Sequence, residues 1–194
     1  MDRLIFLERI QAYSPLSHAC KDALSAGLAR RMAPEQTRLP VAVGPTRQLL
    51  MVASGIARVF VETDDGRDVT RYFVRAEDFV LANFDGERAA VERVEAVTDL
   101  TYVTIDYARF EDLLARYPEL SVFFAQALRE RGLRQRDSAA RRLRGDEFET
   151  YASFLSAYPG LELEVPTAHI ASYLGMTPNE YMRLRQRYRE RAVM

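Results

Sequence analysis

The sequence predicts an α+β protein: a β-roll flanked by helices, then one long helix, then a pair of short helices near the C-terminal end. Three observations support this prediction. Strand-like alternation is confined to residues 32–106, helical periodicity dominates on both sides of that segment, and the last stretch carries two capped helices around a glycine. At 194 residues the chain can form one large or two small domains with a hydrophobic core.

The N-terminal segment has the apolar spacing of two helices. Residues 3–12 place Leu4, Leu7 and Ile10 on one helical face. After a serine–proline break, Ser17 is a suitable N-cap, and we expect the helix that it begins to run to about Arg31.

Residues 32–106 contain short strands separated by turn-forming residues. Prolines and glycines break any helix here, and Asp65–Gly66 favours a tight hairpin turn because this pair takes positive φ angles. We expect strands at 48–53, 56–63, 68–75, 79–84, 92–97 and 100–105. Together they favour an antiparallel β-roll or barrel.

Helical periodicity returns at Tyr107. Asp106 can cap a helix over 107–117, and Pro118 can begin the longer helix that follows. The longer helix carries one apolar stripe between charged flanks: Leu120, Phe123, Phe124, Ala127, Leu128 and, less regularly, Leu133. A stripe of this kind often pairs with a second copy, so we expect a homodimer; packing of the helix on the roll is the alternative.

The C-terminal stretch is expected to contain another amphipathic helix, a short strand over Leu161–Val165 and two final helices. Thr167 can cap the first of these two, and Gly175 can end it in the left-handed conformation that glycine adopts without strain. Thr177 can cap the second helix, with Pro178 at its first position. This is the layout of a helix-turn-helix whose second helix enters the DNA major groove.

The second of these helices is rich in arginine. Its arginines are Arg183, Arg185, Arg187, Arg189 and Arg191. The whole chain has a net charge of −1, but residues 1–120 hold 15 basic and 19 acidic side chains, whereas residues 121–194 hold 12 and 9. A basic C-terminal part fits contact with nucleic acid there; a small helical pair with a solvated basic face is the alternative.

Composition argues against several other classes of protein. The single cysteine, Cys20, excludes an internal disulfide, and two histidines are too few for a histidine-rich metal site, so we expect no metal and no cofactor. No signal peptide or long apolar run occurs, which predicts a cytoplasmic protein without membrane contact. The sequence contains no glycine-rich phosphate loop and no serine- or cysteine-centred triad, so it does not favour an enzyme.

Short motifs accompany this order of elements. They are Gly55-Ile-Ala-Arg-Val-Phe, Gly66, Glu77-Asp-Phe, Phe110-Glu-Asp-Leu-Leu, Tyr117-Pro-Glu-Leu, Tyr158-Pro-Gly, Val165-Pro and His169-Ile-Ala-Ser-Tyr-Leu-Gly-Met-Thr-Pro. Over essentially the whole chain, this combination resembles the Crp/Fnr family of bacterial transcription regulators and looks like its short Bacteroidetes-type subgroup. The resemblance implies a cyclic-nucleotide-binding-like sensor domain over 1–117, a dimerisation helix over 118–144 and a helix-turn-helix DNA-binding domain over 145–194.

The resemblance also implies which residues contact DNA. They lie on or just before the second helix: Thr177, Pro178, Asn179, Met182, Arg183, Arg185 and Arg187. Arg183 matches the family's most persistent base- or phosphate-contacting arginine, whereas Arg185 and Arg187 are expected at phosphates or in solvent rather than at bases. Met182 replaces a usual small residue, and it either meets a thymine methyl group or reduces close approach to the groove.

For the sensor domain, the resemblance implies a nucleotide pocket without its usual polar groups. Leu81-Ala82 and Ala90-Val91 stand where cyclic-AMP binders carry Gly-Glu and Arg-Ser, and Gln135 and Arg136 stand at the adenine contacts. Arg88 lies close enough in the sequence to reach into the pocket. A buried phosphate without its arginine is costly, so we expect no cyclic-AMP binding in the usual mode. The pocket is then filled by side chains or holds a different, more apolar ligand.

We therefore expect a homodimeric DNA-binding transcription regulator. An effector or partner would change the pair of long helices and with it the spacing of two recognition helices. Double-stranded DNA and a second copy of the chain are the expected partners, with an unidentified small-molecule effector as an option. The alternative is a ligand-binding or protein-interaction module of the same fold whose helix-turn-helix no longer reads DNA. Met182 motivates this alternative, and so does the lack of the β-hairpin wing that many members of the resembled family place after the recognition helix.

Overall fold

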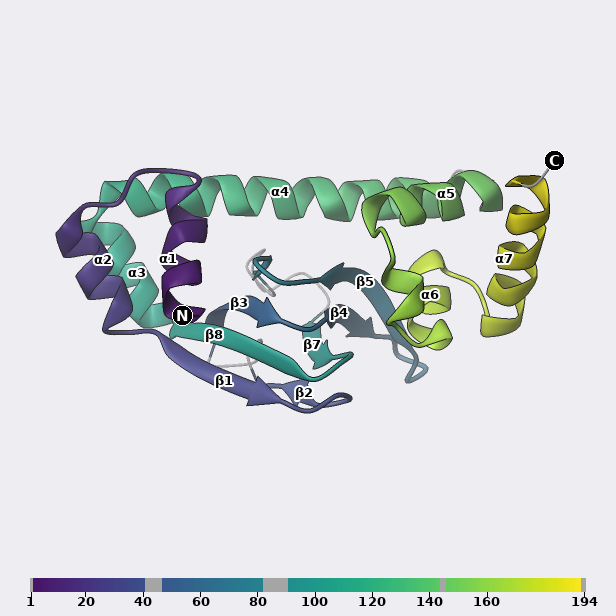
Figure 1. The fold of residues 1–194 in the computed structure, drawn as a ribbon, viewed down its shortest axis with the longest axis horizontal. Helices are drawn as coiled ribbons and strands as arrows, with labels where there is room; N and C mark the ends of the chain where they lie inside the picture. The colour runs from purple at the N-terminus through teal and green to yellow at the C-terminus, as the bar shows by residue number, and fades with distance from the viewer. Residues whose placement is uncertain (1, 41–46, 82–90, 144–145, 193–194) are drawn as a thin grey trace.

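The computed structural model describes residues 2–40, 47–81, 91–143 and 146–192. Figure 1 shows the long helix α4 (Pro118–Leu143) spanning the molecule on one side of a β-roll, with the N-terminal helices and the helix before α4 at one end and the C-terminal helices at the other. We call residues 146–192 the C-terminal unit. No helix in the described ranges is long and apolar enough to cross a membrane.

The first helices are α1 (Asp2–Gln11) and α2 (His18–Ser25), and Ser17 caps α2 as expected, because its hydroxyl accepts a hydrogen bond from the Cys20 amide. Two details of the prediction are wrong. Leu4 is 61% exposed, and the inward residues of α1 are Phe6, Leu7 and Ile10. The second helix also ends six residues before Arg31.

The segment that was expected to finish this second helix is a strand, β1 (Ala29–Ala33). It pairs antiparallel with β8 (Leu100–Asp106), from Ala29 opposite Thr104 to Ala33 opposite Leu100. Three successive residues of β1 are exposed, so the sequence carries no two-residue alternation that could reveal it. Pairing with a strand about seventy residues away outweighs the local helical pattern.

Within the described residues the roll forms two antiparallel four-stranded sheets, with strand orders β1-β8-β3-β6 and β2-β7-β4-β5. The remaining strands are β2 (Arg38–Leu39), β3 (Gln48–Ser54), β4 (Ala57–Glu62), β5 (Asp68–Val74), β6 (Phe79–Val80) and β7 (Glu92–Ala96). The expected antiparallel roll is confirmed, and the predicted hairpin turn at Gly66 has its positive φ of 78°. The strand expected at 79–84 is two residues long in the described part, and residues 82–90 lie outside it.

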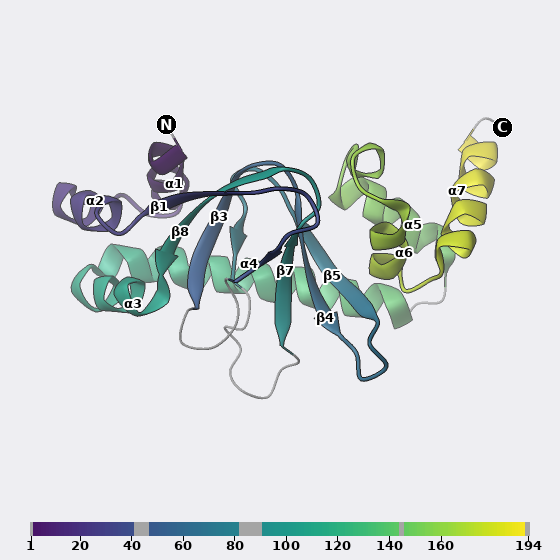
Figure 2. The ribbon, with the colours of Figure 1, turned by 90° about the horizontal axis from the view of Figure 1, so that it is seen from below.

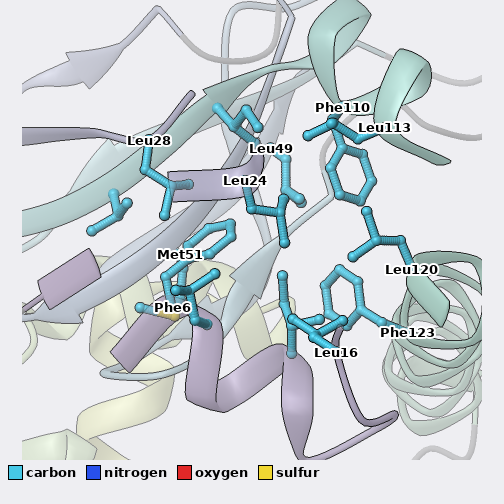
Figure 3. Close-up of a cluster of buried hydrophobic side chains, with 14 of the residues drawn as sticks. Phe6, Leu16, Leu24, Leu28, Leu49, Met51, Phe110, Leu113, Leu120 and Phe123 are labelled. Carbon is cyan, nitrogen blue, oxygen red and sulfur yellow. The ribbon is translucent and has the colours of Figure 1, made fainter. Parts of the chain in front are cut away.

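The helices bury an apolar cluster against β3 and β8. Figure 3 shows side chains from α1, α2, α3 (Tyr107–Arg116) and α4 meeting there, Phe6, Leu24, Phe110 and Phe123 among them. Among the described side chains of α4, the buried apolar ones are Leu120, Phe123 and Ala127. The first half of the stripe that suggested a dimer seam therefore packs on this protein's own core.

The C-terminal unit contains α5 (Glu147–Ala157), α6 (Thr167–Leu174) and α7 (Pro178–Ala192). The strand expected over Leu161–Val165 is wrong: residues Leu161–Leu163 form a short 3₁₀ helix, with Leu161 buried and Leu163 79% exposed. The cap expected at Thr167 is also wrong. Thr167 is the first residue of α6, and Pro166 precedes it without a side-chain cap.

Candidate nucleic-acid interface and sensor region

The turn between α6 and α7 is set by glycine and by a reciprocal cap. Gly175 has φ 75°, and the Met176 amide donates to the carbonyl of Ala171 across the turn (3.0 Å). The Thr177 amide donates to Glu180 Oε2 (2.7 Å), and the Glu180 amide donates to Thr177 Oγ1 (3.3 Å). The backbone hydrogen bond from Thr177 is the largest cause that lowers the pKa of Glu180. The predicted cap is confirmed as a capping box.

One face of α7 packs against α5. Tyr181 and Leu184 are buried, and the ring of Tyr151 meets the rings of Tyr181 and Tyr188 edge-on at 5.9 and 5.0 Å. These contacts fix the rotation of α7 about its axis. The opposite face is turned to solvent, and Thr177, Pro178, Asn179, Met182, Arg183 and Arg187 are exposed on it or at its start.

The arginines of α7 fall into two groups. Arg183 is exposed and forms no salt bridge with any residue that the structure describes. Arg185 and Arg189 both lie 3.3 Å from Glu162 Oε1, and Arg187 lies 2.6 Å from Glu147 Oε2. Arg185 is mostly buried at 21% exposure, so it serves the packing of α7 rather than its open face.

The open face of α7 carries both signs of charge. A hollow of about 530 Å³ beside it is lined by Glu147, Glu180, Arg183, Gln186, Arg187 and Glu190. The carboxylates in this hollow repel a phosphate, whereas Arg183 and Arg187 attract one. The carboxylate of Glu180 already accepts the capping hydrogen bonds, and the carboxylate of Glu147 is already paired with Arg187.

The inner side of α6 brings a histidine to a buried ionic network on the roll. Arg58 of β4 is 4% exposed, and its guanidinium donates to Glu95 Oε2 (2.8 Å) and Asp68 Oδ2 (2.7 Å). His169 of α6 interacts electrostatically with these three charged groups. Burial is the main cause that lowers its pKa, and Arg58 lowers it further, while Glu95 and Asp68 oppose the shift.

We predict that folding stability falls as the pH drops through about 6.5, the ordinary pKa of histidine. Below that value the unfolded chain binds a proton that folded His169 does not, whereas above it His169 is neutral in both states. Denaturant unfolding between pH 7.5 and 5 measures this slope. The slope should be shallower in His169→Gln and unchanged in His18→Gln, which alters an exposed histidine. Equal slopes in wild type and His169→Gln would contradict the prediction.

The structure describes only some of the residues expected at the effector pocket. Leu81 is buried, Val91 is 54% exposed and Arg136 is exposed on α4. Ala82, Arg88 and Ala90 lie outside the described residues, as does the side chain of Gln135. The grouping of these residues into one pocket therefore stays a prediction.

A small cavity lies between α1, the turn before β6 and α4. Its lining is Arg9, Tyr13, Tyr72, Glu77, Asp78, Phe79, Leu81, Ala127, Glu130 and Arg131, and its volume is about 20 Å³. This is room for about one water molecule. Arg131 and Glu92 form a buried ion pair at 2.7 Å, with side-chain exposures of 7% and 5%. This pair ties α4 to the start of β7.

Several solved structures share this architecture. A putative transcriptional regulator of the Crp/Fnr family from Eubacterium rectale matches with a TM-score of 0.74 and 17% identity over 95% of this chain and 88% of that one. The c-di-GMP-responsive global regulator CLP from Xanthomonas campestris matches at 0.69 and 18% identity, covering 91% and 93%. FixK2 from Bradyrhizobium japonicum matches at 0.68 and 18%, covering 85% and 86%. The chain has the fold of Crp/Fnr regulators. No protein-family model and no curated protein matches the sequence.

Within this Crp/Fnr fold, sequence reasoning missed two sets of charged residues. Glu147 and Glu162 form ion pairs with three arginines of α7, and the Arg131–Glu92 pair connects α4 with β7. The first set had no local signal, because the partners come from α5 and from the 3₁₀ helix. Arg131 did have a local signal in the sequence. It follows Ala127 by four residues and so shares the inward face of α4.

Proposed function

We propose that this protein is a DNA-binding transcription regulator in which α6 and α7 form a helix-turn-helix and α7 is the recognition helix. The observation that carries the proposal is Arg183, exposed on the outward face of a helix whose start is fixed by a capping box and whose rotation is fixed by Tyr181 and Leu184. The regulator fold over most of the chain supports the same function. In this proposal residues 1–117 form the sensor domain, residues 118–144 the dimerisation helix and residues 145–194 the DNA-binding domain.

The residues of α7 would then take different roles. Arg183 would read a guanine, a contact worth about 1–3 kcal/mol of discrimination. Thr177, Pro178 and Asn179 would lie close to the DNA backbone at the start of the helix. Arg187 can leave Glu147 and reach a phosphate. Breaking this ion pair costs little free energy because both side chains are more than half exposed. Arg185 would stay with Glu162 and position the helix.

The experiment that tests the function is DNA binding by the full chain. Duplexes selected from random DNA with the wild type serve as probes, and electrophoretic shifts are measured over a series of salt concentrations. We expect Arg183→Ala to lose roughly 5- to 150-fold in affinity for the selected sequence. Arg189→Ala is the matched control: it removes the same charge from the same helix, and it should weaken selected and unselected DNA alike.

Two results would argue against a DNA-reading helix. Wild type without salt-sensitive, sequence-selective binding would remove the function itself. Equal losses in Arg183→Ala and Arg189→Ala would leave DNA binding in place but remove Arg183 as the reader of a base.

We also propose that the protein acts as a homodimer through the outer face of α4. Val122 and Leu133 are 46% and 48% exposed there, and Arg129 and Arg136 lie on the same face at helical spacing. We expect Leu133→Glu to shift light scattering at tens of micromolar from dimer towards monomer, because two carboxylates would meet at the seam. Leu163→Glu, at the 79% exposed leucine outside α4, should leave the dimer intact. A wild type that is monomeric at this concentration would contradict the proposal.

We propose that the sensor takes no cyclic AMP in the usual mode. Leu81 is buried and apolar where cyclic-AMP binders have a glycine, and the cavity beside it has a volume of only about 20 Å³. Arg131, which faces this region from α4, is already committed to Glu92. Side chains rather than a nucleotide would fill this part of the roll.

A second candidate function is a protein-interaction module of the same fold. The observation that favours it is the acidic lining around Arg183, formed by Glu147, Glu180 and Glu190. In this case the face of α7 would take a partner carrying both charges. The DNA-binding experiment separates the two candidates, since an interaction module would show no preference among DNA sequences.

A further inference from the structure

Strand β5 ends its sheet on one side and is covered there by the C-terminal unit. Among the strands that the structure describes, in the order β2-β7-β4-β5, it has a strand neighbour only on the β4 side. Figures 1 and 2 both show α6 beside β5. Unpaired backbone groups at such an edge need other hydrogen-bond partners when they are buried.

A β-bulge decides which backbone groups of β5 face outward. Val59 pairs with Tyr72 and Phe60 with Thr70, so Arg71 is the extra residue. Because side-to-side alternation slips by one residue at a bulge, the amides of Thr70 and Phe73 can both point away from β4. These two amides and the carbonyl of Asp68 are the groups that the C-terminal unit meets.

Side-chain hydroxyls of the C-terminal unit take the place of a missing neighbouring strand. The Thr70 amide donates to Ser172 Oγ (2.9 Å), and Ser172 Oγ donates to the carbonyl of Asp68 (2.7 Å). The Phe73 amide donates to the Tyr158 hydroxyl (3.3 Å). Ser172 belongs to α6 and Tyr158 follows α5, so both helices are tied to one strand edge.

Aromatic contacts surround these hydrogen bonds. Phe73 is fully buried, with its ring centroid 5.6 Å from that of Tyr158 and 5.7 Å from that of Tyr173. Arg75 Nη2 donates to the carbonyl of Pro159 (2.9 Å). The C-terminal unit is thus docked on the roll by a specific surface, in addition to its covalent link to α4.

The same strand reaches the interior of the sensor roll. Tyr72, next to Phe73, belongs to the apolar cluster between the sheets and lines the cavity that Arg131 of α4 also lines. Neighbouring residues of β5 therefore contact the sensor interior and the C-terminal unit. A shift of this strand would move α6 with it.

We propose that Ser172 is a positioning residue that sets the orientation of α7 relative to the roll and to α4. In a dimer this orientation determines the distance between the two recognition helices and hence the half-site spacing that the protein accepts. The inference rests on the proposed DNA-binding function and deepens it. In this inference the two hydrogen bonds of the Ser172 hydroxyl to the edge of β5 determine the orientation of α7.

The test compares Ser172→Ala, Ser172→Thr and the control Ser156→Ala in the full chain. Ser156 is an exposed serine of α5, so its variant removes a hydroxyl from the same unit away from β5. The probes are duplexes carrying one selected half-site, or two at a series of spacings around 10 base pairs. We expect wild type to prefer one spacing. Ser172→Ala should lose at least fivefold of that preference while binding a single half-site as wild type does, and Ser172→Thr should restore it.

Hydrogen exchange gives a second readout that needs no DNA. The Thr70 amide should exchange at least tenfold faster in Ser172→Ala than in wild type or Ser156→Ala, because it loses its acceptor. Unchanged exchange at Thr70 would overturn the inference. So would faster exchange with an unaltered spacing preference, since the bond would then hold the unit without setting its geometry. Wild type that binds no DNA would instead remove the proposed function, while the exchange data would still report on docking.

Discussion

Replacing Arg58 with methionine should lower the free energy of unfolding by about 3–5 kcal/mol. Arg58 is 4% exposed and donates to Glu95 Oε2 (2.8 Å), Asp68 Oδ2 (2.7 Å) and Thr70 Oγ1 (3.3 Å). Asp68 is 24% exposed and keeps Arg38 at 3.5 Å, so water and that arginine can compensate its charge. Glu95 is 8% exposed and loses its partner, which makes it the main source of the cost. Urea unfolding followed by circular dichroism measures the effect.

Two further variants show whether the cost comes from the uncompensated charge. Arg58→Met combined with Glu95→Gln should recover part of the loss, because the buried group left behind is then neutral. Arg67→Met removes an arginine whose side chain is 80% exposed and pairs with Asp65, so it should change stability by no more than about 0.5 kcal/mol. A loss below about 1 kcal/mol in Arg58→Met would show that Glu95 finds solvent or another partner.

Local chemical signals explain which parts of the fold the sequence predicts. Ser17, Asp106 and Thr177 cap helices as expected, because a cap needs only the backbone of the next few residues. Gly66 and Gly175 likewise reveal turns through their own backbone conformation. These elements can be predicted before any tertiary contact is known.

Elements that depend on distant partners are the ones that sequence reasoning misses. β1 exists because β8 supplies its hydrogen bonds, and Leu161–Leu163 turns into a 3₁₀ helix because Leu161 is buried in the cluster of the C-terminal unit while Leu163 is not. The inward stripe of α4 is a related case. Periodicity shows that this helix has an apolar face, but it does not say whether the roll or a second copy covers that face.

The candidate interface shows the same division. The spacing of α7 places Arg183 on its outward face, since Tyr181 and Leu184 mark the inward one. The ion pairs of Arg185 and Arg187 with Glu162 and Glu147 cannot be read from spacing, because the acidic partners lie 23 and 40 residues earlier in the chain. A run of alternate arginines looks uniformly basic in sequence, yet the fold leaves only part of it open to a phosphate.

Replacing Phe73 with alanine should cost about 3–5 kcal/mol and should also uncouple the C-terminal unit from the roll. Phe73 is fully buried, and Ile56 and Val97 of the roll join it in one cluster with residues of α5, α6 and α7. The cavity left by the ring would therefore lie at the contact between the two parts rather than inside either one. Calorimetry should show one unfolding transition in wild type and two in Phe73→Ala, the first belonging to the C-terminal unit.

Phe60→Ala is the matched control for this uncoupling. Phe60 is equally buried on the adjacent strand β4, but its ring lies under the guanidinium groups of Arg58 and Arg38, at 4.3 and 5.2 Å, and not in the shared cluster. Its removal should lower the unfolding temperature of a single transition. A single transition in both variants would mean that the ionic network and the hydroxyl bonds at β5 keep the two parts cooperative without Phe73. Two transitions in Phe73→Ala alone would show that the aromatic contacts of Phe73 make the roll and the C-terminal unit unfold together.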